Sequence, residues 1–317
     1  MATAKKMVGE WYTVLMNKES SDGGGSNNNV ETKIEEAKKW AVSKDLFYAA
    51  SDVVDGLPSG LYNCGVSQQI GPYLQKIVCD TDHLIFFKDS PSYEVLDEIK
   101  GFWELKENFK KHGFLHKRGV LLVGSPGCGK TGIVQQLIKM VTTEYNGIAI
   151  YGDVPKVVSS CLQLVRRIEN ERPIIVIFED FDSLIEQYGE NEYLALFDGE
   201  SQVNNIVFIA TSNYPERLDK RFTNRPSRFD LIKEISMPDD EIRREYIKHK
   251  VPELSDDDLE KWVKFSEGYS FAHIRELIIL ICCYNKSIED ASDRLNNMRT
   301  GKLSSGNFDN GIKSTTT

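Results

Sequence analysis

One stretch of eight residues restricts the possible folds of this chain more than any other. Residues 124–131 read GSPGCGKT, the pattern G-x-x-x-x-G-K-T, and they follow directly on the apolar run 120–123. A buried strand, a glycine-rich turn and a helix in this order form a phosphate-binding loop. The apolar residues between 133 and 141 recur at helical spacing, which supplies the helix. The chain is therefore predicted to bind a nucleoside triphosphate within an α/β fold.

Each residue type in this loop suits phosphate chemistry. Glycines let successive backbone N–H groups turn inward around phosphate oxygens. The N-terminus of the following helix adds unpaired donors and the positive end of the helix dipole. Lys130 is expected to reach the β- and γ-phosphates, and the Thr131 hydroxyl to ligate Mg²⁺. The predicted nucleotide-binding residues of the loop are Ser125, Pro126, Gly127, Cys128, Gly129, Lys130, Thr131 and Gly132.

Composition sets the class of protein and its surroundings. A chain of 317 residues is long enough for two or three packed units, and its 40% hydrophobic and 27% charged content is ordinary for a globular protein. Six cysteines without paired metal spacing indicate reduced thiols and a cytoplasmic location. No apolar stretch approaches a membrane span in length, so we expect no membrane association. The formal net charge of −9 disfavours nucleic acid as a partner.

The order of patterns along the chain predicts five parts. Strand and helix patterns alternate through the middle of the chain, as in a parallel sheet with helices on both faces. Helical patterns alone follow this region, and they predict a small lid domain. The expected parts are an N-terminal extension and flexible linker (1–30), a small α+β module (31–91), the α/β nucleotide-binding domain (92–238), a helical lid (239–299) and a disordered tail (300–317).

The predicted N-terminal module combines one helix with three short strands. A helical pattern extends from about residue 31 to 54, with Ile34, Ala37 and Trp40 on one face. Turn residues then separate strand candidates at 60–66, 73–78 and 84–87. This module is predicted to hold a protein partner.

Polar residues follow two apolar strands of the predicted sheet. Glu179 and Asp180 come directly after the run 174–178, and Asn213 follows the run 206–212. Carboxylates at the carboxyl end of a buried parallel strand lie in the crevice where α/β sheets bind ligands. We expect one carboxylate to hold Mg²⁺ and the other to orient the attacking water, with their assignment left open. Asn213 is expected to reach the γ-phosphate or that water.

The segment that follows completes a set of four motifs in order. Residues 213–230 read NYPERLDKRFTNRPSRFD, and the pattern N-x-P-x-x-L-D…R-P-G-R-F-D identifies a resemblance to the AAA branch of the AAA+ ATPases over about residues 92–298. This resemblance implies ATP hydrolysis with Mg²⁺. It also implies that Arg225 and Arg228 reach into the neighbouring subunit's site, so the protein is expected to form a homo-oligomeric ring, usually of six.

Four further features refine the resemblance. Residues 268–274 are similar to the family's G-[FY]-S-G-A-D-[LI] stretch, which implies that Ala272 lies near adenine and ribose. The acidic pair is Glu then Asp, the reverse of the usual order, as in the subgroup of the mitochondrial Rieske-protein translocase. The leucine-rich stretch that ends in Asp198-Gly199 also resembles that subgroup. Little room is left for a substrate-threading loop before the helix that is expected to begin at Pro155.

These patterns support one leading function and two alternatives. The leading hypothesis is an ATP-hydrolysing ring that remodels or moves a protein partner. The first alternative is a nucleic-acid motor or loader, which the acidic balance of the chain weakens. The second is a nucleotide-gated assembly protein with slow turnover, which the reversed acidic pair keeps open.

Overall fold

Contacts within the chain divide it into two units. The sheet unit comprises residues 1–84, 94–123 and 131–234, and the helical unit comprises 85–93, 124–130 and 235–317. The predicted N-terminal extension (1–30) and tail (300–317) lie outside the described residues. The computed structural model describes residues 39–43, 46–50, 55–68, 70–78, 85, 87, 91–198, 203–225 and 227–299.

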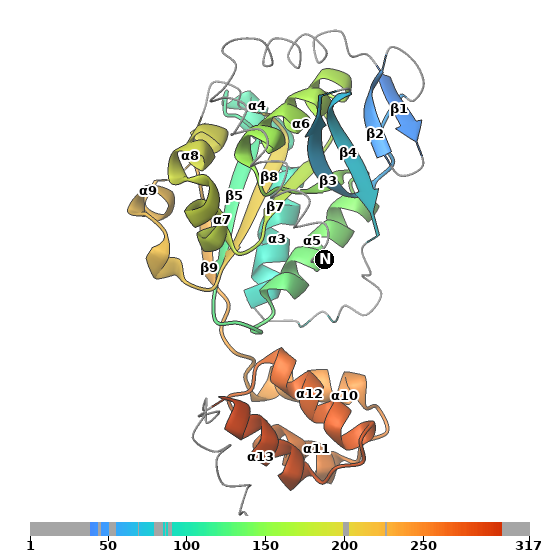
Figure 1. The fold of residues 1–317 in the computed structure, drawn as a ribbon. Helices are drawn as coiled ribbons and strands as arrows, with labels where there is room; N and C mark the ends of the chain where they lie inside the picture. Colours follow the sequence, from blue (N-terminus) through green and yellow to red (C-terminus); the bar gives the residue numbers. More distant parts are fainter. Residues whose placement is uncertain are drawn as a thin grey trace, which may run out of the picture. The chain divides into compact units, whose positions relative to one another are not determined.

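A nine-stranded sheet forms the centre of the sheet unit, in the order β1-β2-β4-β3-β6-β7-β8-β5-β9 (Figure 1). The strands from β3 through β6, β7, β8 and β5 to β9 pair in parallel, whereas β1, β2 and β4 pair antiparallel. The predicted α/β sheet is therefore confirmed. The strands are β1 Lys39–Ser43, β2 Leu46–Ala50, β3 Gly60–Ser67, β4 Gly71–Ile77, β5 Lys117–Val123, β6 Ile148–Tyr151, β7 Ile174–Phe178, β8 Ile206–Ser212 and β9 Leu231–Glu234.

The two middle strands explain why the sheet holds together. Every residue of β7 and β8 is buried, as the continuous apolar sequence of each strand predicts for a parallel sheet covered on both faces. Helix α6 packs against β3 and β4, and α7 packs against β8. The helices of this region are α3 Pro91–Glu104, α4 Lys106–Lys111, α5 Lys130–Thr143, α6 Pro155–Ile168, α7 Phe181–Tyr188, α8 Glu190–Asp198 and α9 Lys220–Thr223, with a 3₁₀ turn at Pro215–Arg217.

The N-terminal region differs from the sequence-based expectation. A helix was expected over 31–54, but the described part of this range forms the antiparallel hairpin β1–β2. Trp40 and Phe47 are buried in the core, so burial against the sheet outweighs the helical spacing that also includes Trp40. The other residues of that spacing lie outside the described residues. The helix prediction is therefore wrong for β1 and β2.

Two of the three strands expected after this hairpin are confirmed. Those at 60–66 and 73–78 are confirmed as β3 and β4. Of the strand expected at 84–87, only Ile85 and Phe87 are described, and neither belongs to a strand. Because β3 pairs with β6, the N-terminal strands extend the central sheet. The sequence pattern predicts a separate module for this region instead.

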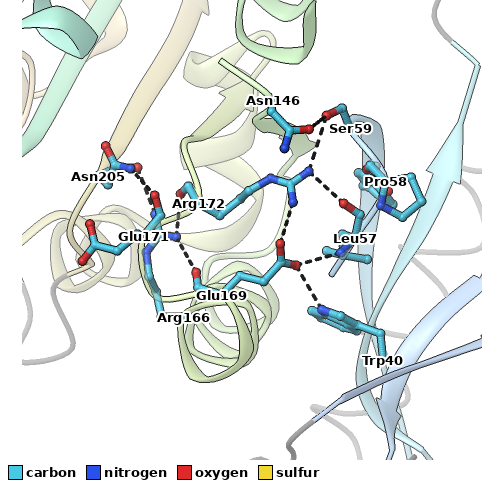
Figure 2. A network of polar contacts seen from close by, with 11 residues as sticks. Trp40, Leu57, Pro58, Ser59, Asn146, Arg166, Glu169, Glu171, Arg172 and Asn205 are labelled. Atoms are coloured by element: carbon cyan, nitrogen blue, oxygen red, sulfur yellow. Dashed lines mark hydrogen bonds and ion pairs between the residues drawn. The ribbon is translucent and has the colours of Figure 1, made fainter. Parts of the chain in front are cut away.

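A polar network at the amino ends of β6 and β7 fastens the N-terminal strands to the core (Figure 2). Glu169 Oε2 and Arg172 Nη1 form an ion pair of 2.6 Å, and each side chain is 12% exposed. Glu169 Oε1 accepts hydrogen bonds from Trp40 Nε1 at 3.1 Å and from Leu57 N at 2.9 Å. Arg172 Nη2 donates to Leu57 O at 2.8 Å. One buried ion pair thus anchors both the β1 strand and the segment before β3.

The helical unit contains four helices between residues 240 and 299 and, among its described residues, no strand. Three of these helices begin at a side-chain cap of the expected type: Asp239, Ser255 and Ser270 each accept a hydrogen bond from a backbone N–H of the first turn. Within the described residues, no helix is both long and apolar enough to cross a membrane. The helices are α10 Asp240–Lys250, α11 Asp256–Phe265, α12 Phe271–Cys282 and α13 Ile288–Arg299.

Candidate functional site

The phosphate-binding loop adopts a backbone that glycine favours. It connects the end of β5 at Val123 to the start of α5 at Lys130. Gly127 and Gly129 have φ values of +78° and +112°, which side chains with a Cβ rarely adopt. Residues 125–127 are exposed, whereas Cys128 is buried. The strand, loop and helix thus follow one another as the sequence predicts.

Lys130 folds its side chain along the loop. Its Nζ donates to Gly124 O at 2.6 Å and to Ser125 O at 3.1 Å, and lies 3.7 Å from Cys128 Sγ. The side chain is largely buried, although it stands in the first turn of α5. Thr131, the next residue, is exposed. The ammonium group is therefore held among the loop carbonyls, where a phosphate group bound by the loop would meet it.

Within the helical unit, the start of α12 packs against this loop. Phe271 N donates to Gly127 O at 3.1 Å. A Cβ at Gly127 would lie 2.8 Å from Ser270 Oγ and 3.3 Å from the Ala272 Cβ, and a Cβ at Gly129 would lie 3.1 Å from the Phe271 ring. Ala272 therefore lies beside the loop, and its expected place near adenine and ribose stays a prediction. The loop glycines also make room for α12.

Aromatic rings gather next to the loop, and sequence reasoning missed them. Phe271 stacks on Phe87 with ring centroids 5.6 Å apart and planes at 22°, and Tyr246 meets Phe271 edge-on at 5.3 Å. Phe271 occupies the place of the second glycine in the family's G-[FY]-S-G-A-D stretch. That departure was visible in the sequence, but its partners Phe87 and Tyr246 are distant along the chain and follow from the fold alone.

In the sheet unit, the predicted polar residues meet at the carboxyl ends of β7 and β8. Asn213 Nδ2 donates to Asp180 Oδ1 at 3.0 Å, and Asp180 N donates to Thr211 Oγ1 at 3.1 Å. Asp180 is exposed and Glu179 is half-buried. Asp180 has φ 51° and ψ 53°, a left-handed conformation that aspartate tolerates better than most residues. The structure therefore brings Asp180 and Asn213 together.

A second carboxylate, that of Asp182, contacts the carboxyl end of β8. Ser212 Oγ donates to Asp182 Oδ1 at 2.6 Å, and both side chains are buried. Ser212 Oγ in turn accepts from Tyr214 N at 3.1 Å. Asp182 thus joins the first turn of α7 to β8, and Glu179 and Asp180 are the two acids predicted to act at this edge.

The side chains at this edge suit a magnesium ion. Mg²⁺ prefers oxygen ligands and keeps several waters, so it needs few protein groups. The Thr131 hydroxyl, the carboxylates of Glu179 and Asp180 and the Asn213 amide supply such oxygens. Val123, the last residue of β5, pairs with Ser212, the last residue of β8, so the end of β5 adjoins that of β8. These oxygen donors are of the kind that Mg²⁺ prefers, and the assignment of Thr131, Glu179 and Asp180 as its ligands stays a prediction.

The two predicted arginines have different surroundings. The Arg228 side chain is only 7% exposed, and its Nε lies 2.6 Å from Asp198 Oδ2. Its Nη1 donates to the backbone oxygen of Arg221. The Arg225 side chain is 63% exposed, and its Nη1 lies 3.5 Å from the same Asp198 oxygen. The sequence assigned both arginines one role, but the structure buries Arg228 and exposes Arg225.

Part of the chain is similar to known proteins. Residues 120–237 match the family model described as "ATPase family associated with various cellular activities (AAA)". Protein SAV of Sulfolobus acidocaldarius is 32% identical over 202 residues, which cover 56% of this chain and 25% of that protein. The human ATPase family gene 2 protein homolog A is 31% identical over 195 residues, 54% of this chain and 22% of that protein.

Two further relatives extend the same comparison. The cell division cycle protein 48 homolog of Archaeoglobus fulgidus is 32% identical over 188 residues, 54% of this chain and 26% of that protein. The vesicular-fusion protein sec18 of Schizosaccharomyces pombe is 29% identical over 204 residues, 53% of this chain and 25% of that protein. The chain thus spans about a quarter of the length of these relatives.

Proposed function

We propose that this chain, of which residues 120–237 match the AAA ATPase family model, hydrolyses Mg-ATP within a homo-oligomeric ring and uses the energy to remodel or move a protein partner. The observation that carries this proposal is the Asp180–Asn213 hydrogen bond at the carboxyl ends of β7 and β8. It joins an acid to an amide at the sheet edge that adjoins the end of β5. In the loop, the positive φ values of the glycines shape the backbone that we propose binds the phosphates.

Each of the predicted site residues has a proposed task. Lys130 and the backbone N–H groups of residues 125–131 bind the phosphates, and Thr131 with Glu179 holds Mg²⁺, which neutralises charge on the phosphates when bound. Asp180 is exposed and accepts from Asn213, so the two are suited to orient a water for attack on the γ-phosphate. Asp180 rather than Glu179 is therefore the proposed base.

The aromatic group supplies a surface for the nucleobase. Phe271 and Phe87 present flat, apolar rings beside the phosphate loop, with Ala272 next to them. Purine bases stack on such rings with a gain of about 1–3 kcal/mol per base. We assign the adenine of ATP to this surface.

The proposal includes a ring and a protein partner. The 63% exposed Arg225 is available to a neighbouring subunit, and its resemblance to the family's trans-acting arginine supports a ring, with six subunits as the expected number. The acidic balance of the chain favours a protein over a nucleic acid as partner. The likeness to the Rieske-translocase subgroup and the cytoplasmic location stay predictions.

ATP binding and turnover by three proteins test the proposed function. The Lys130→Ala variant is expected to lose binding of a fluorescent ATP analogue, because the loop then lacks its cation. Lys139→Ala, which removes a lysine from the same helix, is the matched control and should bind as the unchanged protein does. Turnover by Lys130→Ala at the unchanged rate, or no turnover by the unchanged protein, would contradict the proposal. Stimulation by nucleic acid would favour the motor hypothesis instead.

A further inference from the structure

Three consecutive side chains at the end of β8, those of Thr211, Ser212 and Asn213, each bond to the turn between β7 and α7. Two of these bonds reach Asp180, and the third reaches Asp182. From this arrangement we infer that Ser212 and Asp182 are positioning residues for hydrolysis, because together they hold the Asn213 amide against the Asp180 carboxylate. The inference rests on the proposed function, which gives the attacking water to Asp180 and Asn213.

The end of β8 is joined to its two neighbouring strands in different ways. On one side Ser212, the last residue of β8, pairs with Val123, the last residue of β5. On the other side β7 ends at Phe178, which pairs with Ala210, two residues before the end of β8. Beyond Ala210, side chains therefore replace strand pairing in joining β8 to the segment that follows β7.

The Ser212 hydroxyl acts as donor and acceptor at once. Its Oγ donates to Asp182 Oδ1 at 2.6 Å and accepts from Tyr214 N at 3.1 Å. A hydroxyl has one hydrogen to donate, so Asp182 fixes the direction of that hydrogen and a lone pair is left for the Tyr214 N–H. Because Tyr214 follows Asn213, the backbone is held on both sides of Asn213, by β8 before it and by the Ser212 hydroxyl after it.

Asp182 is a firm anchor for this hydroxyl. It lies in the first turn of α7, and both it and Ser212 are buried. The N-terminal end of a helix stabilises a carboxylate, and a distance of 2.6 Å is typical of a hydroxyl that donates to a charged acceptor. Loss of either partner leaves the other buried with a polar group to satisfy. The Ser212–Asp182 bond is therefore a rigid link between β8 and α7.

Asp180, the other member of the proposed catalytic pair, is held by its backbone. Its N–H donates to Thr211 Oγ1 at 3.1 Å, and its carbonyl oxygen accepts from two backbone N–H groups in the first turn of α7. Asn213, in contrast, lies beyond the end of β8, so its orientation relies on the Ser212 hydroxyl. The 3.0 Å bond from Asn213 Nδ2 to Asp180 Oδ1 thus depends on Ser212 more than on Asp180.

Single variants measure the two links. Ser212→Ala removes both bonds of the hydroxyl and should lower kcat by about 10–100-fold, because a misplacement of about 1 Å at a reacting group has effects of this size. Affinity for a fluorescent ATP analogue should not change, since the phosphate loop is not altered. Asp182→Ala should behave as Ser212→Ala does, whereas Asp182→Asn keeps an oxygen acceptor and should keep kcat within about threefold. Ser183→Ala, which alters an exposed serine of the same turn, is the control and should change neither quantity.

The double variant Ser212→Ala/Asn213→Ala separates positioning from a structural role. If Ser212 acts through Asn213, its removal should have no further effect on kcat once Asn213→Ala has been made. All variants are assayed below the lowest of their melting temperatures, so that kcat refers to folded protein, and Asp182→Ala in place of Ser212→Ala repeats the test.

Two outcomes would overturn the inference alone. One is that Ser212→Ala lowers kcat by the same factor in the presence and absence of the Asn213 side chain, because Ser212 would then not act through Asn213. The other is an unchanged kcat in Ser212→Ala while Asn213→Ala is impaired. Unchanged kcat in Asn213→Ala would overturn the proposed function, and the inference with it.

Discussion

The two ends of the parallel sheet use polar residues in opposite ways. At the amino ends of β6, β7 and β8, the charged side chains are mostly buried and bonded to the backbone. At the carboxyl ends of β7 and β8, an exposed aspartate is held by one amide and one threonine. The polar residues at the amino ends of the strands thus serve stability, and those at the carboxyl ends are suited to chemistry.

Arg166 illustrates the amino end. Its guanidinium donates to Asn204 O at 2.9 Å, to Asn205 O at 2.9 Å and to Arg172 O at 2.7 Å, and so joins the turns before β7 and β8 (Figure 2). Burial lowers the pKa of Arg166 to about 10, which leaves it charged at neutral pH. Backbone oxygens, which cannot titrate, receive its hydrogen bonds. The network is therefore insensitive to pH near neutrality at this residue.

Asp180 illustrates the carboxyl end. Its left-handed backbone is a feature that a residue selected for stability alone would avoid. Functional sites tolerate such conformations because the surrounding structure enforces them. Here the buried Ser212–Asp182 bond supplies that support.

The largest effect is expected at the carboxyl end. Asp180→Asn keeps the hydrogen bond geometry but removes the base, so kcat should fall by about 10²–10⁴-fold, or about 3–5 kcal/mol of activation free energy. Its free energy of unfolding should change little, because the side chain is exposed. Steady-state ATPase assays and denaturant titrations measure the two quantities. A stable variant with unchanged kcat would remove Asp180 from the chemistry.

At the amino end, an effect of comparable size is expected on the free energy of unfolding and not on turnover. Glu169→Ala strands Arg172 and leaves Trp40 Nε1 and Leu57 N without an acceptor, so the free energy of unfolding should fall by about 3–5 kcal/mol. Turnover per folded molecule should not change. The exposed Glu107→Ala is the control for stability. Loss of turnover with unchanged stability would break the division between the two ends.

The smallest effect is a pH dependence at the amino end. His116 is buried, stacks on Phe102 with centroids 3.9 Å apart, and has Nδ1 3.0 Å from Asn205 Oδ1. Burial lowers its pKa below the usual 6.5. The unfolded chain therefore takes up the proton first as pH falls, so His116 contributes stability above pH 6.5 that is lost as pH falls below it.

Melting temperatures between pH 5 and 8 measure this dependence. The unchanged protein should lose more stability below pH 6.5 than His116→Phe, which keeps a ring against Phe102 but cannot titrate. Equal slopes in the two proteins, or a gain in stability on acidification that depends on His116, would show that burial does not control this histidine.

Local patterns predicted the parts of the fold that depend on neighbouring residues. A few consecutive residues are enough to recognise the phosphate loop, the acidic ends of the apolar strands and the helices after residue 239. The β1–β2 hairpin did not, because its strands exist through pairing with β4 and through the contact of Trp40 with Glu169, 129 residues away. Five-residue strands carry too little periodicity to outweigh a coincidental helical spacing.

The arginine segment shows the same limit at the candidate site. Its motif predicted the residue types, but the burial of Arg228 depends on Asp198 at the end of another helix. No spacing within residues 225–230 distinguishes the two arginines. The difference between them appears only once α8 and the segment before β9 are folded together.

Turnover per subunit as a function of protein concentration, with molecular size determined in ATP and in ADP, shows whether the nucleotide sites are completed between subunits. If sites are completed between subunits, turnover should rise steeply as the assembly forms and should then become constant. Constant turnover by a monomer at every concentration would contradict the account, because Arg225 would then have no neighbouring nucleotide to act on.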